Sequence, residues 1–78
     1  MSDQTITTFE KKDGEEVRVT LNDYHGHKIF HIRVYYRDAN GDWQPGKGIA
    51  LPVDLYQDLA SAVLQLGEQL MRDGILVR

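Results

Sequence analysis

The sequence predicts an α+β domain in which a curved, four-stranded antiparallel sheet is followed by one C-terminal helix, in the order β-β-β-β-α. Two segments with apolar residues at every second position predict strands, and an Asn-Gly pair predicts a hairpin. After Pro52 the apolar residues recur at intervals of three or four, which predicts an amphipathic helix. With 78 residues, the chain fits a single domain.

The first part of the sheet comes from two segments. TITTF (residues 5–9) favours a short strand within residues 1–13, a segment that we expect to be flexible. After a turn at Asp13-Gly14, EVRVTLN (16–22) directs apolar side chains to one face and polar side chains to the other, as a half-buried strand does. We expect the sheet itself to span residues 15–51.

The second part of the sheet carries the strongest strand signal. In KIFHIRVYY (28–36), one face holds Phe30, Ile32 and Val34, and the other holds Ile29, His31, Arg33 and Tyr35. A tight turn at Gly26 precedes this strand, because glycine adopts a positive φ without steric cost. The hairpin at Asn40-Gly41 leads to the last strand, KGIAL (47–51).

A helix is predicted over residues 52–73, with Pro52 in its first turn and Gly74 as its stop. Residues 74–78 form a tail that docks as a short strand or extends the apolar contact. A domain of this size buries only about 60% of its unfolded surface, and one helix covers only part of a sheet. We therefore predict a dimer. Its predicted interface is the apolar stripe of the helix: Leu55, Leu59, Val63, Leu66 and Leu70.

The charges are unevenly distributed, although the net charge is −3. Residues 24–37 contain three Lys or Arg, all three His and no Asp or Glu, together with four of the chain's aromatic residues. Cations that follow a phosphate backbone and rings that stack on unpaired bases suit single-stranded nucleic acid. The plainer interpretation is that tyrosine and exposed arginine are ordinary strand residues. The predicted nucleic-acid-binding set is Tyr24, His25, His27, Lys28, Arg33, Tyr36, Arg37, Trp43 and Lys47.

Other classes of function find little support. The chain has no cysteine, and no nucleophile can be paired with a base, so we expect no enzyme and no catalytic residue. Neither carboxylate nor thiolate joins the three histidines; we expect no metal and no cofactor, and treat them as weak, pH-dependent contributors of charge. No apolar run approaches the roughly 18 residues of a membrane span. We expect a cytoplasmic protein, nucleoid-associated in a bacterium, with no membrane partner.

The order of these features resembles the transcriptional coactivator family of positive cofactor four. The shared pattern is an aromatic and a glycine in the first turn (Tyr24, Gly26), an I-R-x-Y-aromatic strand (32–36), a D-x-x-G loop (38–41) and the P-G-basic-G-I-x-L strand (45–51). A helix with an early aromatic, Tyr56, follows. The match spans roughly residues 17–66. Within this family, the chain looks more like the short bacterial or phage members.

The resemblance implies a homodimer that binds single-stranded DNA or melted duplex on a concave sheet surface. It implies base stacking on Tyr24 and Tyr36, and it places Tyr36 outward although simple alternation places it with the core. It also implies a binding role for Arg33, and for His25, His27 and Lys47 at positions where the family carries basic residues. The sequence departs from that pattern because histidines replace the basic residues of the turn.

The leading hypothesis is a dimeric, sequence-tolerant binder of single-stranded DNA that serves transcription or DNA maintenance. RNA is an alternative ligand on the same surface, because stacking and phosphate contacts do not distinguish the sugar. A second class of function is a protein-interaction dimer whose sheet face docks a peptide, a polymerase subunit or another part of the transcription machinery, with the rings as anchors.

Overall fold

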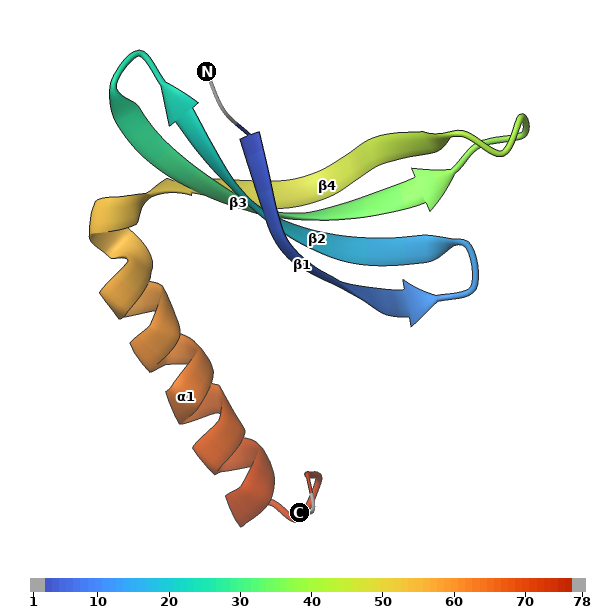
Figure 1. The fold of residues 1–78 in the computed structure, drawn as a ribbon. Helices are drawn as coiled ribbons and strands as arrows, with labels where there is room; N and C mark the ends of the chain where they lie inside the picture. The colour runs from blue at the N-terminus through green and yellow to red at the C-terminus, as the bar shows by residue number, and fades with distance from the viewer. Residues whose placement is uncertain (1–2, 77–78) are drawn as a thin grey trace.

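The computed structural model describes residues 3–76 and has the predicted architecture (Figure 1). Four antiparallel strands form one sheet in the order β1-β2-β3-β4, so that each strand pairs with its neighbour in sequence. A 3-10 turn and one long helix follow. The elements are β1 (Asp3–Lys12), β2 (Glu15–Tyr24), β3 (His27–Arg37), β4 (Trp43–Pro52), η1 (Val53–Leu55) and α1 (Tyr56–Arg72).

The sheet begins earlier than the sequence pattern indicates. β1 pairs with β2 from Asp3 to Lys12, so the sheet includes residues 3–12 and does not begin at residue 15. Two irregularities, between Thr5 and Thr7 and between Glu10 and Lys12, interrupt the register of β1. An extra residue in a strand breaks the period of two, which is why the alternation in this segment is too weak to mark a full-length strand.

The register of β2, β3 and β4 divides the sheet into two faces, because residues that pair directly across strands share a face. The predicted alternation in β2 and β3 is confirmed. We call one side the apolar face; it carries Val17, Val19, Leu21, Phe30, Ile32, Val34, Ile49 and Leu51. We call the other the polar face; it carries Glu16, Arg18, Thr20, Asn22, Tyr24, His27, Ile29, His31, Arg33, Tyr35, Arg37 and Trp43.

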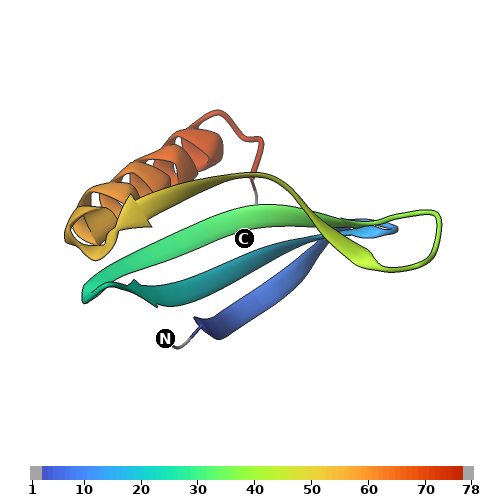
Figure 2. The ribbon, with the colours of Figure 1, turned by 90° about the horizontal axis from the view of Figure 1, so that it is seen from above.

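Helix α1 does not lie across the sheet as one helix covering one face would. It leaves the end of β4 and extends away from the strands, as the two views in Figures 1 and 2 show. It meets the apolar face near its N-terminal end, where the ring of Tyr56 packs edge-on against Phe30 with centroids 6.4 Å apart. In residues 3–76 no helix is both long and apolar enough to cross a membrane.

The shape is open as a result. The Cα radius of gyration is 15.1 Å, whereas a compact domain of this length has a radius of about 11.5 Å. Within the described part of the chain no side chain is fully buried. On the helix Val63 is 58% exposed and Leu66 is 57% exposed. The chain therefore presents large apolar surfaces that nothing in the single copy covers.

The C-terminal end of the helix closes with its own hydrogen bonds. Gly74 has a φ of 73°, which confirms it as the stop. The backbone N–H groups of Ile75 and Leu76 both donate to the carbonyl of Leu70, at 2.9 and 3.2 Å. Residues 74–76 therefore cap the helix and add no strand to the sheet. The rest of the predicted tail, residues 77–78, lies outside the described residues.

Candidate nucleic-acid interface

The turn between β2 and β3 presents Tyr24 at one end of the polar face. His25 and Gly26 have φ values of 53° and 81°, and a two-residue type I′ hairpin requires positive φ at both positions. The carboxylate of Asp23 accepts a hydrogen bond from the backbone N–H of Gly26 at 3.2 Å and steadies the turn. The Tyr24 ring meets His25 edge-on, with centroids 4.5 Å apart, and remains 59% exposed. An aromatic surface is thus available to a ligand.

Next to Tyr24, a polar chain of hydrogen bonds links three strands. His31 Nδ1 lies 2.6 Å from Asn22 Oδ1, and Asn22 Nδ2 donates to Asp3 Oδ1 at 2.5 Å. Because the Asn22 oxygen is an acceptor, this contact requires a proton on Nδ1 of His31. The same residues line a shallow hollow with Tyr24 and Ile29. The arrangement orients the His31 ring on the polar face.

The opposite end of the polar face carries a cation–aromatic cluster, formed by Arg18, Tyr35, Arg37 and Trp43. The Arg18 guanidinium carbon lies 4.0 Å from the centroid of the Tyr35 ring and 5.4 Å from that of Trp43. The Arg37 guanidinium carbon lies 4.9 Å from the Trp43 centroid. Arg18 and Tyr35 are absent from the predicted binding set. Alternation alone places both outward, but it does not show that the Arg18 guanidinium lies over the rings of both Tyr35 and Trp43.

Arg33 lies between the two ends and is fixed by β4. It sits directly opposite Arg18 on β2 and Gly48 on β4. Its Nη1 donates to the carbonyl of Gly46 at 2.8 Å. That carbonyl belongs to an irregularity in β4, where the pairing shifts between Arg33 and Tyr35. Half-buried Arg33 therefore has a defined orientation on the polar face.

The structure brings together only part of the predicted set. Five of its members share the polar face: Tyr24, His27, Arg33, Arg37 and Trp43. His25 lies in the turn, and exposed Lys47 lies in the β4 irregularity. Lys28 pairs with Asp23, and Tyr36 pairs with Glu15 and Gln44, so both belong to the side of the apolar face. The expectation that Tyr36 faces the polar side is therefore wrong, because β2 and β3 pair without a break from Glu15 to Tyr24 and the alternation continues to Tyr36.

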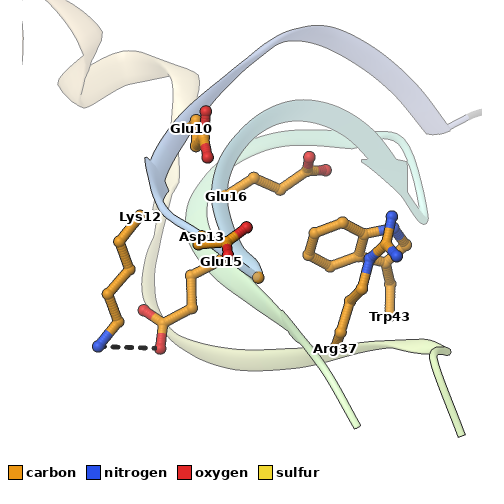
Figure 3. Close-up of a pocket in the computed structure, with 8 residues that line it drawn as sticks. Glu10, Lys12, Asp13, Glu15, Glu16, Arg37 and Trp43 are labelled. Atoms are coloured by element: carbon orange, nitrogen blue, oxygen red, sulfur yellow. Dashed lines mark ion pairs between the residues drawn. The ribbon is translucent and has the colours of Figure 1, made fainter.

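The polar face is not free of acid once the strands are paired. Asp3 on β1 pairs with Asn22 on this face and accepts a hydrogen bond from its side chain. Glu10 on β1 likewise pairs directly with Glu16 on β2. Figure 3 shows Glu10 and Glu16 in a pocket that Arg37 and Trp43 also line. In the same pocket Glu15 pairs with Lys12 at 3.7 Å, and a hydrogen bond from Lys11 lowers the pKa of Glu15. Acidic side chains from β1 and β2 therefore lie beside the cation–aromatic cluster.

The β3–β4 loop that leads to Trp43 is organised by Asp38. Its Oδ1 accepts hydrogen bonds from the backbone N–H groups of Asn40 and Asp42 at 2.9 and 3.0 Å, and its Oδ2 accepts one from Gln44 Nε2 at 3.0 Å. The bond from the Asp42 backbone, followed by that from Gln44, lowers the pKa of Asp38. Asp38 thus acts as a turn-forming residue.

Replacing Asp38 with alanine should loosen this loop and shift the environment of Trp43, which a change in tryptophan emission and a lower protease resistance of the loop would report. Asp42→Ala removes the same charge from the loop and is the control. Because the folded loop lowers the pKa of Asp38, its contribution is present above the ordinary value of 3.8 and is lost as the pH falls further. Identical spectra for both variants at neutral pH would contradict this role.

Comparison with known proteins places this geometry in context. The family model described as Transcriptional Coactivator p15 (PC4) matches residues 11–62. The RNA polymerase II transcriptional coactivator SUB1 of Saccharomyces cerevisiae is 40% identical over 63 residues. That similarity covers 78% of this chain and 22% of the yeast protein, so the chain spans about a fifth of the length of that relative.

Solved structures of PC4 homologues and of MoSub1 also align with this chain. A PC4 homologue from Burkholderia pseudomallei aligns with a TM-score of 0.74 at 24% identity, over 85% of this chain and 90% of that chain, and supports the fold. The bacteriophage T5 homologue of PC4, implicated in recombination-dependent DNA replication, aligns at 0.65 and 28% identity, over 97% and 85% of the two chains. MoSub1, solved as a complex with DNA, aligns at 0.65 and 29% identity, over 92% and 90%.

Proposed function

The chain belongs to the transcriptional coactivator p15 (PC4) family, and from this premise we propose that it binds single-stranded DNA with little sequence preference. In this proposal the protein acts as a homodimer, and the polar face of its sheet is the binding surface. The DNA complex of MoSub1 supports DNA as the ligand, and the coactivator SUB1 supports a role connected with transcription.

The observation that carries the proposal is the arrangement of rings and cations on one face. Tyr24 is exposed at one end, Trp43 lies at the other, and Arg33 is held between them by the carbonyl of Gly46. A strand of DNA laid along this face would place bases on the rings and phosphates beside the guanidinium groups. Such contacts read no base edge, so the binding should tolerate many sequences.

The homodimer is supported by the open apolar surfaces. At 3.6 residues per turn, the leucine stripe and its neighbours Ala60, Leu64, Gly67 and Met71 extend over about half of the helix circumference. A helix that packs on one surface needs an apolar arc of only about 100°. A second copy would cover both this arc and the apolar face of the sheet, and would supply the core that a single copy lacks.

Tyr24→Ala should weaken the binding of a fluorescein-labelled oligo-dT by about five- to 150-fold, which corresponds to the roughly 1–3 kcal/mol that one stacked base contributes. The dependence of the binding constant on salt should not change, because no charge is removed. Tyr24→Phe keeps the ring and is the matched control. Fluorescence anisotropy at two salt concentrations measures both quantities, and equal affinities for the two variants would argue against stacking at this site.

The proposal as a whole is tested by titrating the protein with single-stranded DNA, duplex DNA and RNA of the same length. We expect the single strand to bind most tightly and its affinity to fall as salt is added. A preference for RNA would redirect the proposal to a contact with the 2′-hydroxyl. If none of the three changed the anisotropy at micromolar protein and low salt, the proposal would be rejected in favour of a protein-docking role for the same face.

A further inference from the structure

We propose that Glu16 is a positioning residue that holds the Arg18 guanidinium against Tyr35 and thereby withholds its charge from DNA. The inference rests on the proposed function, since it concerns the same polar face. It assigns an inhibitory contact to the face: the Nε–H of one of its arginines is bonded internally, and the bonded carboxylate offsets the positive charge that a DNA phosphate would meet.

The geometry of the pair is close. Arg18 Nε donates to Glu16 Oε2 at 2.6 Å, a short distance for a charge-assisted hydrogen bond. The guanidinium carbon is simultaneously 4.0 Å from the centroid of the Tyr35 ring. The Arg18 side chain is 26% exposed and that of Glu16 is 24% exposed, so neither charge is fully hydrated. Such a pair is screened less by salt than two charges on the open surface.

The register explains why this contact forms. Glu16 and Arg18 are two residues apart on β2, so they share the polar face, and Tyr35 lies directly opposite Glu16 on β3. From β1, Glu10 faces Glu16, and two like charges in this position favour a nearby cation. From β3, Arg33 faces Arg18, but its guanidinium is bonded toward β4 at Gly46. Arg18 is thus the arginine that neutralises the acidic side.

Two consequences follow for DNA binding. The guanidinium covers one side of the Tyr35 ring, so a base cannot stack there while the contact is intact. In addition, Arg18 brings little net positive charge to the face, because Glu16 is bonded to it. Arg18 should therefore add little to the number of counterions that DNA releases, although it lies among the other binding residues.

Glu16→Gln removes the carboxylate charge and keeps the side-chain shape. We expect it to bind oligo-dT about fivefold more tightly at 50 mM salt, with a salt slope steeper by about 0.7, the value for one additional phosphate contact on a single strand. Glu68→Gln makes the same change of charge on the helix, on the side away from the leucine stripe, and should leave affinity and slope as in the wild type.

The role of Arg18 is separated from simple repulsion by a double-mutant comparison. Arg18→Ala alone should leave the salt slope nearly unchanged, and Glu16→Gln should lose its gain in the Arg18→Ala background. A gain of the same size in both backgrounds would mean that Glu16 only repels phosphate, and it would overturn the inference. So would a Glu16→Gln variant that binds as the wild type does. Failure of the wild type itself to bind would reject the proposed function as well.

Discussion

Val63→Glu should dissociate the proposed dimer and unfold the chain. Val63 is 58% exposed in the single copy and belongs to the predicted apolar stripe of α1. In a dimer that covers this stripe, a carboxylate at position 63 would have to leave water without a partner, at a cost of several kcal/mol. We expect the dimer dissociation constant to rise at least about 100-fold, equivalent to roughly 3 kcal/mol.

The folded state should be lost together with the dimer, because no described side chain is fully buried in one copy. The free energy of unfolding of such a protein depends on its own concentration. The wild-type midpoint of thermal unfolding should therefore rise as the protein is concentrated. Circular dichroism of Val63→Glu should show a chain that is largely unfolded at concentrations at which the wild type is folded.

Gln65→Glu introduces the same charge two residues further along the helix, on the opposite side from the stripe, and serves as the control. It should remain dimeric in analytical ultracentrifugation and should unfold close to the wild-type temperature. A wild-type protein that sediments as a folded monomer, or a Val63→Glu variant with unchanged mass, would exclude the stripe as the interface.

The parts of the fold that follow from local pattern could be predicted from the sequence. The alternation in β2 and β3 fixes which side chains share a face, and the leucine spacing and Gly74 fix the helix and its end. The position of the helix could not be predicted, because it depends on surfaces that local pattern does not describe. The first strand was underestimated because its irregular register hides the period of two.

The same holds for the candidate binding residues, of which only the residue types could be predicted from the sequence. Tyr24, Arg33 and Trp43 could be identified as residue types suited to nucleic acid. The sequence could not show which of these residues lie next to one another, because that depends on how the strands pair. Pairing brings Glu16 and Arg18 beside Tyr35 and places Tyr36 on the other side. A segment without acid thus acquires acidic neighbours from the strands beside it.

Gly48→Ala should destabilise the sheet and displace Arg33. Gly48 pairs directly with Arg33, and a Cβ atom at position 48 would lie 2.6 Å from both the Arg33 Cα and the Ile32 carbonyl oxygen. Both are backbone atoms, so no side chain can move aside and β4 must separate from β3. We expect a loss of about 1–3 kcal/mol in the free energy of unfolding, measured by urea denaturation at fixed protein concentration.

Gly46→Ala provides a graded comparison on the same strand. Its Cβ would lie 3.1 Å from the Val34 carbonyl oxygen, a milder contact that a small shift relieves. We expect Gly48→Ala to cost more stability than Gly46→Ala. DNA affinity should also fall in Gly48→Ala, because separation of β4 from β3 would break the bond that holds Arg33 to the Gly46 carbonyl. Equal losses in the two variants would mean that close approach of β4 to β3 at Gly48 is not what requires glycine there.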